Sequence, residues 1–208
     1  MGLRLFVVRH AQTDWNRERR YQGWQDSPLS EVGRGQAAAV ARALEGGKLD
    51  AVYSSPLRRA VTTAEAIAAP HGLPVRVEEA FREIGFGAWE GLTLEEAQQR
   101  YPDETRHWNE RPHEALPPGG EALGDVRRRV LAGLETLRAE HDGGSICLVT
   151  HGVPARLLIL EVLGLDLSRI WAVHVATTGI SELEFRADWT ALHRMNTLTH
   201  LEAGPAAR

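Results

Sequence analysis

Short apolar runs alternate along the chain with longer segments of helical periodicity. The most apolar runs are LRLFVV, DAVYS and SICLVT, which predict buried strands because both faces of such a strand must meet hydrophobic neighbours. Strands are predicted at residues 3–8, 50–54, 74–77, 145–150, 171–176 and 180–186. Pro74, at the start of the third of these, favours an edge position for that strand.

Helices are predicted between the strands, where apolar positions recur every three to four residues. The first has Ser30 as its N-cap and ends before Gly46. Further helices are predicted at 57–69, 94–101, 125–141 and 157–163, with irregular segments at 81–92 and 109–122. This alternation, without linker or repeat, predicts one α/β domain over residues 1–202 with a mostly parallel sheet. We expect residues 203–208 to form a flexible tail.

Composition and charge narrow the classes of partner. The chain has 208 residues, of which 43% are hydrophobic and 25% charged, as in ordinary globular proteins. A net charge of −4 argues against a binder of nucleic acid or of anionic membranes. The single cysteine, Cys147, excludes an internal disulfide, and no stretch approaches the roughly 18 apolar residues that span a membrane. We expect a cytoplasmic protein, and a homo-oligomer is left open.

The residues that follow the three most apolar strands are the main candidates for chemistry. Arg9 and His10 follow the first, Arg58 and Arg59 lie just beyond the second, and His151 follows the third. Ligands of parallel α/β sheets bind beyond the carboxyl ends of the strands, so we expect these side chains to converge. They would repel one another unless an anion lay among them. A phosphoryl group fits, because guanidinium and imidazole groups bind its oxygens.

Motifs for other phosphate chemistry are missing from the sequence. The residue six positions after Cys147 is Val153 rather than the arginine of a cysteine phosphatase loop, and Lys48 lacks the spacing of a P-loop. The remaining histidines have no known metal-ligand spacing; they include His107, His113, His193 and His200. We therefore predict no metal site, and a histidine nucleophile is the best candidate.

An ordered set of short motifs extends these observations. They are RHAQT (9–13) with Trp15-Asn16, QG (22–23), DSPLS (26–30), SPLRRA (55–60), REIGFG (82–87) with WEG (89–91), PGGE (118–121) and THG (150–152). Together they resemble the histidine phosphatase superfamily, in its phosphoglycerate mutase-like branch. The resemblance implies a three-layer α/β/α fold with a mostly parallel central sheet.

The resemblance also implies roles for individual residues. His10 would be the nucleophile that forms a phosphohistidine, and Glu83 would protonate the leaving oxygen and then act as the base for water. Arg9, Arg59 and His151 would bind the non-bridging phosphoryl oxygens.

Supporting residues follow from the same motifs. Asn16 and Gln22 would donate hydrogen bonds to the phosphate or to the attacking water, and Gly23 and Gly152 would permit close approach of the backbone. Arg58, which does not stand directly before the alanine of SPLRRA, is expected to be solvated.

Two positions depart from the usual pattern of the family, and three tryptophans lie beside its motifs. Ala11 stands where glycine is usual, and Gln12 where glutamate is usual. The tryptophans at positions 15, 24 and 89 either line an apolar pocket for the organic part of a substrate or pack in the core.

Three functions remain open on the sequence. The first is a metal-independent phosphatase without cofactor, acting on a small phosphomonoester. It is favoured by resemblance to the compact phosphatases of the family, in the short interval of 68 residues from Glu83 to His151, where mutases carry an insertion, and in the sequence Tyr21-Gln22-Gly23. The second is a phosphoglycerate mutase, which would need a bisphosphoglycerate primer. The third is an inactive phosphate-binding module, against which the complete set of catalytic residues argues.

Overall fold

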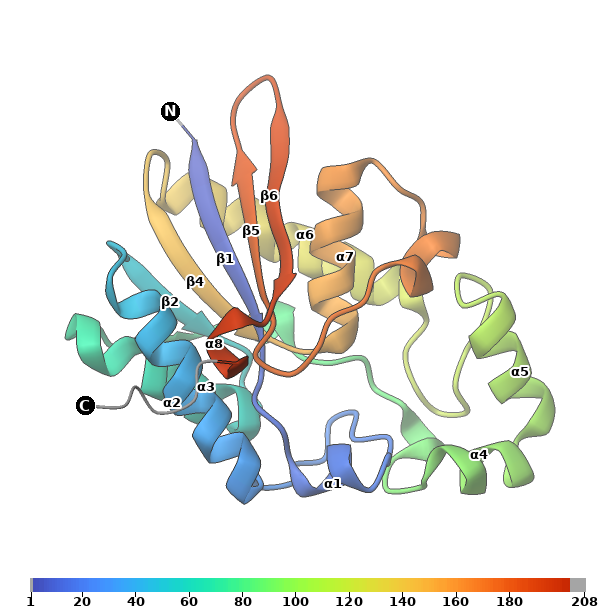
Figure 1. Ribbon diagram of the computed structural model, residues 1–208. Coiled ribbons are helices and arrows are strands. Elements are labelled where there is room, and N and C mark those ends of the chain that lie inside the picture. Colours follow the sequence, from blue (N-terminus) through green and yellow to red (C-terminus); the bar gives the residue numbers. More distant parts are fainter. Residues whose placement is uncertain (1, 203–208) are drawn as a thin grey trace.

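A six-stranded sheet with helices on both faces makes up the fold (Figure 1). The computed structural model describes residues 2–202, so the tail predicted over 203–208 lies outside the described residues. The strands are β1 (Leu3–Arg9), β2 (Ala51–Ser54), β3 (Val75–Val77), β4 (Ser145–Thr150), β5 (Ile180–Phe185) and β6 (Thr190–Thr197). They lie in the order β3-β2-β4-β1-β5-β6, with β3 at an edge as predicted. The pairs among β1 to β4 are parallel, whereas β5 is antiparallel to both of its neighbours.

Side chains of the central strands alternate between the two faces of this sheet. Leu5 and Val7 of β1 pack with α6 (Leu123–Glu140) and α7 (Gly152–Leu163). Val8, one residue further on, packs with α2 (Glu31–Glu45) and α3 (Arg58–Ala68) on the opposite face. A strand with both faces buried must be apolar throughout, which explains the continuous runs in the sequence. The predicted three-layer α/β/α fold is confirmed.

Several predicted helix boundaries agree with the structure to within two residues. The Ser30 hydroxyl accepts a hydrogen bond of 3.0 Å from the backbone N–H of Gly33 and caps α2, as predicted. The shorter helices are α1 (Asp14–Arg17), α4 (Leu94–Arg100), α5 (Pro102–Glu110) and α8 (Thr199–Glu202). Four 3₁₀ helices occupy Ala69–His71, Glu79–Phe81, Gly87–Trp89 and Leu167–Ala172. Within residues 2–202, no helix is long and apolar enough to cross a membrane.

The strand predicted at 171–176 is wrong. Its first residues end the 3₁₀ helix Leu167–Ala172, and the rest is an extended segment outside the sheet. The strand that follows this segment in the chain, β5, lies beside β1 in the sheet. The carbonyl oxygens of Val173 and Val175 accept hydrogen bonds from the arginine side chains of Arg156 and Arg9, so side chains replace a neighbouring strand as partners.

Two helices and one strand differ from the sequence prediction in other ways. Helix α7 begins at Gly152 rather than at 157, because Pro154 lies in its first turn, where a missing N–H costs nothing. Helix α5 was not predicted, although Pro102 at its first position is a helix-start signal. Strand β6 was also missed, since its exposed, mostly polar residues lack an apolar run.

Candidate active site

The carboxyl ends of β1, β2 and β4 lie together, and the candidate residues follow them. Arg9 pairs in register with Thr150 between β1 and β4, and the His10 backbone N–H donates to the Thr150 carbonyl at 2.8 Å. The imidazole rings of His10 and His151 lie 5.1 Å apart, centroid to centroid. The structure therefore brings together the residues that the sequence placed after separate strands.

The imidazole of His10 is held in its neutral form. The side chain is 2% exposed, and its Nδ1 lies 2.8 Å from the carbonyl oxygen of Ala11. Because a carbonyl can only accept, Nδ1 carries the proton and Nε2 keeps its lone pair. Burial, followed by the positive charges of Arg59 and Arg9, lowers the pKa of His10 well below its ordinary value. His10 is therefore neutral at physiological pH.

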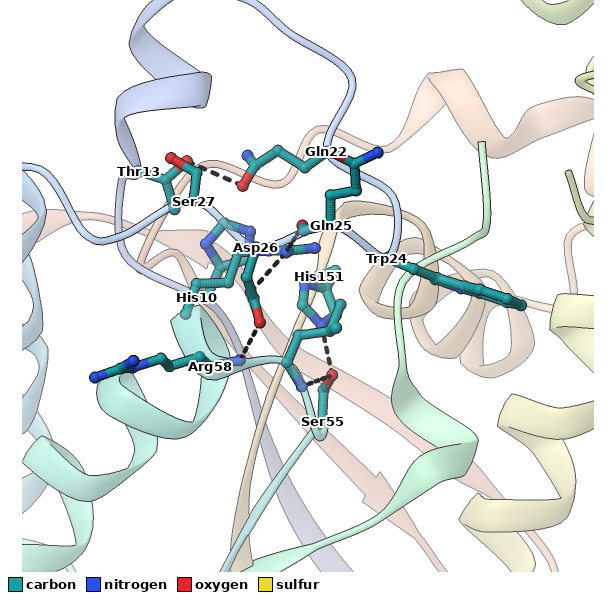
Figure 2. Close-up of polar contacts among 12 residues, drawn as sticks. His10, Thr13, Gln22, Trp24, Gln25, Asp26, Ser27, Ser55, Arg58 and His151 are labelled. Atoms are coloured by element: carbon teal, nitrogen blue, oxygen red, sulfur yellow. Dashed lines mark hydrogen bonds and ion pairs between the residues drawn. The ribbon is translucent and has the colours of Figure 1, made fainter. Parts of the chain in front are cut away.

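The imidazole of His151 is oriented by Ser55, a residue to which the sequence assigned no role. Its Nε2 lies 2.6 Å from the Ser55 hydroxyl, which also accepts from the Leu57 N–H at 3.3 Å (Figure 2). The hydroxyl proton is thus available to Nε2, which leaves Nδ1 protonated. Burial and the charge of Arg59 lower the pKa of His151 well below its ordinary value. Two signals in the sequence pointed to Ser55: it follows a buried strand directly, and it begins the motif SPLRRA.

Two arginines complete the cationic side of the site. Arg9 donates to the carbonyl oxygen of Val175 at 2.9 Å, and Arg59 binds the Asp26 carboxylate at 3.0 Å and the Gly23 carbonyl at 2.8 Å. Arg58 is exposed and points away from the two histidines (Figure 2), in agreement with its expected solvation.

Three buried donors at this site have no partner among the described residues: Nε of Arg9, Nε of Arg59 and Nδ1 of His151. Buried donors in proteins are ordinarily hydrogen-bonded. A buried donor without a partner is a candidate contact for an oxygen-rich anion.

Glu83 lies on the cavity wall at the N-terminus of α7. Its carboxylate accepts backbone hydrogen bonds from Gly152 at 3.1 Å, Val153 at 3.2 Å and Ile84 at 3.0 Å. The start of a helix is a favourable place for a carboxylate, because unpaired N–H groups point outward there. The Glu83 backbone is also fixed, since its carbonyl accepts from Trp24 and Arg129, both at 3.0 Å.

Asn16 and Gln22 line the same cavity as His10, and both contact Thr13. The Thr13 backbone N–H donates to the amide oxygen of Asn16 at 3.0 Å, and the Thr13 hydroxyl donates to that of Gln22 at 3.0 Å. With both oxygens engaged, the NH₂ groups remain as donors. Gly23 has a φ of +53°, and a β-carbon there would collide with the side chain of Glu90, so glycine is required.

Comparison with known proteins agrees with this geometry. Residues 5–198 match the model of the histidine phosphatase superfamily, branch 1. The chain belongs to the histidine phosphatase superfamily. It is 38% identical to phosphoserine phosphatase 1 of Hydrogenobacter thermophilus, over 96% of this chain and 94% of that protein. The solved structure of Bacillus stearothermophilus YhfR is 34% identical, with a TM-score of 0.92, and the match covers 96% of this chain and 99% of that one.

A mutase is also among the relatives within the superfamily. The 2,3-bisphosphoglycerate-dependent phosphoglycerate mutase of Beijerinckia indica is 34% identical, over 83% of this chain and 87% of that protein. This match spans less of the chain than the match to the phosphoserine phosphatase.

The two departures from the usual superfamily pattern lie outside the cavity. Ala11 is fully buried, its N–H donates to the Thr63 hydroxyl at 3.1 Å, and its φ is not positive, so glycine is not required there. The Gln12 side chain accepts from the Ser30 hydroxyl at 2.8 Å, next to the N-cap of α2. Neither substitution removes a donor from the phosphoryl-binding group.

A cavity of about 580 Å³ opens at the site formed by Arg9, His10 and Arg59. Its lining contains eight of the nine predicted site residues: Arg9, His10, Asn16, Gln22, Gly23, Arg59, Glu83 and Gly152. The other lining residues are Arg20, Tyr21, Phe86, Leu94, Trp108, Asn109, Val153, Arg156 and Trp171.

The predicted tryptophans are not part of this lining. Trp89 is fully buried in the core, and Trp24 is exposed beneath the guanidinium of Arg82. Trp108 and Trp171 line the cavity instead. They come from α5 and from the 3₁₀ helix Leu167–Ala172, both of which the apolar pattern did not reveal.

The two neutral histidines make the fold sensitive to acid. Both have a folded-state pKa below the ordinary value, so the unfolded chain binds more protons as the pH falls below about 6.5. The free energy of unfolding should therefore fall below pH 6.5, by up to about 1.4 kcal/mol per pH unit for each histidine, and level off at the folded-state pKa values.

Urea unfolding of wild type, His10→Gln and His151→Gln between pH 5 and 8 tests this expectation. Each variant should show a shallower fall in stability than wild type. Equal slopes for all three proteins would contradict it.

Among residues 2–202, no group of three His, Cys, Asp or Glu side chains is placed to hold a metal ion.

Proposed function

We propose that the chain is a metal-independent hydrolase of small phosphomonoesters that works through a phosphohistidine at His10. The observation that carries this proposal is the set of three unpartnered buried donors around a neutral histidine. Guanidinium and imidazole groups neutralise phosphoryl charge without a metal. In this proposal residues 1–202 act as one catalytic domain.

In the first step, His10 Nε2 attacks phosphorus and the bond from phosphorus to the ester oxygen breaks. Arg9, Arg59 and Nδ1–H of His151 bind the non-bridging oxygens, whose charge changes as the phosphoryl group moves. Protonated Glu83 gives its proton to the leaving oxygen, so the alcohol departs neutral. The products are an alcohol and a phosphohistidine whose Nδ1–H remains bound to the Ala11 carbonyl.

In the second step, water attacks the phosphohistidine. Glu83, now a carboxylate, takes a proton from the water while the bond from phosphorus to Nε2 breaks. Neutral His10, inorganic phosphate and protonated Glu83 are restored. Asn16 and Gln22 bind the water or a phosphate oxygen through their NH₂ groups.

Hydrolysis, rather than transfer to a second substrate hydroxyl, is supported by the relatives. The phosphoserine phosphatase match covers 96% of this chain, against 83% for the phosphoglycerate mutase. An inactive phosphate-binding module is disfavoured because the nucleophile, the acid and the cationic donors are all in place around one cavity.

Turnover should be independent of metal ions and of a primer. p-Nitrophenyl phosphate hydrolysis should be unchanged, within about twofold, by EDTA, because the charge is neutralised by arginine. Conversion of 3- to 2-phosphoglycerate should be slower than phosphate release, with or without 2,3-bisphosphoglycerate. Loss of hydrolysis on chelation would refute metal independence, and primer-stimulated isomerisation faster than hydrolysis would favour the mutase.

A further inference from the structure

Glu83 lies in an irregular segment, whereas the two histidines of the site directly follow strands. Residues 82–86 belong to no helix or strand of the fold. His10 and His151 come directly after β1 and β4, so the sheet itself sets their positions. The backbone around Glu83 must therefore be held by other contacts.

The guanidinium of Arg129, on α6, holds three backbone carbonyls of this region. Its Nη1 donates to the carbonyl oxygens of Ala80 at 2.9 Å and Arg82 at 2.6 Å, and its Nη2 donates to that of Glu83 at 3.0 Å. The Glu121 carboxylate accepts from Nε at 3.2 Å and from Nη2 at 2.9 Å. These bonds use all five N–H donors of the guanidinium, so none is left for a ligand.

Glu121, the last residue of the PGGE motif, holds both this arginine and the segment that carries Glu83. Its carboxylate also accepts from the backbone N–H of Gly85 at 2.8 Å, and its own backbone N–H donates to the Gly85 carbonyl at 2.9 Å. Gly120 approaches the same carbonyl so closely that a β-carbon would lie 2.4 Å from its oxygen. The motif therefore anchors the chain two residues beyond Glu83.

The position of this backbone decides what the Glu83 carboxyl can reach. A general acid must lie within hydrogen-bond distance of the oxygen that it protonates. The carboxylate reaches the N–H groups of Gly152 at 3.1 Å and Val153 at 3.2 Å from a backbone whose carbonyl is bound by Arg129. A misplacement of about 1 Å at a reacting group can cost on the order of 10²-fold in rate.

We propose that Arg129 and Glu121 are positioning residues for Glu83, which fix its backbone so that the carboxyl meets the leaving oxygen. This inference rests on the proposed function, in which Glu83 is the acid. Neither Arg129 nor Glu121 is among the residues that line the cavity, so both act through Glu83 rather than on a substrate. Their ion pair, at 2.9 Å, joins two side chains that are each only 21% exposed, where charged hydrogen bonds are strong.

Arg129→Lys is the decisive variant, because it keeps the positive charge and removes the planar fork. The charge should be kept because, after burial and the charge of Arg59, that of Arg129 also helps to lower the pKa of His151. An ammonium group has three donors on one nitrogen, so it cannot bind three carbonyls and a carboxylate together.

Arg129→Lys should lower kcat/KM about 10- to 100-fold for an alkyl phosphate and less than about threefold for p-nitrophenyl phosphate. The alkoxide needs a proton from Glu83 as it leaves, whereas nitrophenolate does not. Glu121→Gln, which keeps the shape but weakens both anchors, should show the same selectivity with a loss of about 3- to 10-fold. The matched control is Arg127→Lys, which alters an exposed arginine of the same helix, bound to Glu161 at 2.8 Å, and should leave both rates unchanged.

The Glu83→Gln background separates positioning of the acid from support of the fold. The acid is already absent there, so adding Arg129→Lys should slow the alkyl phosphate by less than about threefold more. A further loss of about 10- to 100-fold in this background would overturn the inference, because the arginine would then act independently of Glu83. Circular dichroism establishes that each variant is folded before it is assayed.

The possible failures can be told apart. Equal losses for the two esters in folded Arg129→Lys, or no loss for either, would overturn the positioning role. If Arg129→Lys does not fold, Glu121→Gln decides by the same criterion. If Glu83→Gln shows the selective loss and neither of these variants does, the phosphatase mechanism stands and this inference falls. If wild type hydrolyses neither ester, the proposed function itself fails.

Discussion

Replacing His10 with alanine should lower kcat for every phosphomonoester by at least about 10⁴-fold. Nε2 of His10 carries the attacking lone pair, and alanine removes it. That nitrogen stays unprotonated because the Ala11 carbonyl holds the proton on Nδ1, and because burial and the charges of Arg59 and Arg9 lower the pKa of the imidazole. Water would then have to attack the ester directly, without covalent catalysis. Steady-state assays with p-nitrophenyl phosphate and an alkyl phosphate measure the loss. The matched control, His193→Ala, removes an exposed histidine that is paired with Glu184 at 2.7 Å and should keep full activity.

The covalent intermediate gives this prediction a second measurement. Rapid quenching of wild type with ³²P-labelled substrate should trap a protein-bound phosphate that is labile to acid and stable to base, and His10→Ala should trap none. Ser55 is the informative alternative, because its hydroxyl lies in the same group of residues. Label on Ser55, or undiminished turnover in His10→Ala, would contradict the mechanism.

The sequence predicted the phosphoryl-binding end of the site well, for a physical reason. Buried parallel strands must be continuously apolar, and the residue after each strand is placed by the sheet itself. Arg9, His10 and His151 could therefore be located from short runs alone. Their convergence required that the two strands be parallel neighbours, and β1 and β4 are.

The tryptophan wall of the cavity, formed by Trp108 and Trp171, could not be predicted in the same way. Trp108 lies on a helix with a mostly polar surface, and Trp171 on a 3₁₀ helix in the region predicted as a strand. Arg156 is held by the carbonyl oxygen of Val173, 17 positions further along the chain, and no local pattern encodes that contact. The tryptophan wall thus depends on contacts between distant segments, whereas the positions of Arg9, His10 and His151 depend on strand ends.

The region predicted as a strand at 171–176 connects the tryptophan wall with Arg9. Its carbonyl oxygens at Val173 and Val175 bind Arg156 and Arg9. Alternating hydrophobicity is present because Val173 and Val175 are buried while His174 is exposed. The pattern therefore reported the alternating burial of these residues, but the predicted strand is wrong, and side chains rather than a strand satisfy these two carbonyls.

Replacing Glu83 with glutamine should lower kcat/KM by about 10²- to 10⁴-fold for an alkyl phosphate and far less for p-nitrophenyl phosphate. An alkoxide must be protonated as it leaves, whereas nitrophenolate is stable without a proton. The ratio kcat/KM reports the steps up to transfer of phosphate to His10, so it isolates the role of Glu83 as an acid from its later role as a base. Measuring kcat/KM for a series of esters should give a steeper dependence on leaving-group pKa in Glu83→Gln than in wild type.

Glu90 supplies the matched control for the same change in charge. Its carboxylate accepts from the backbone N–H groups of Trp24 and Phe86, both at 3.0 Å, but it does not line the cavity. Glu90→Gln should therefore weaken the loop to a degree similar to Glu83→Gln, which also disturbs backbone hydrogen bonds, and should leave the leaving-group dependence as in wild type. Equal losses for alkyl and nitrophenyl esters in Glu83→Gln would show that Glu83 only holds the start of α7, because misplacing Gly152 and Val153 would slow both esters alike.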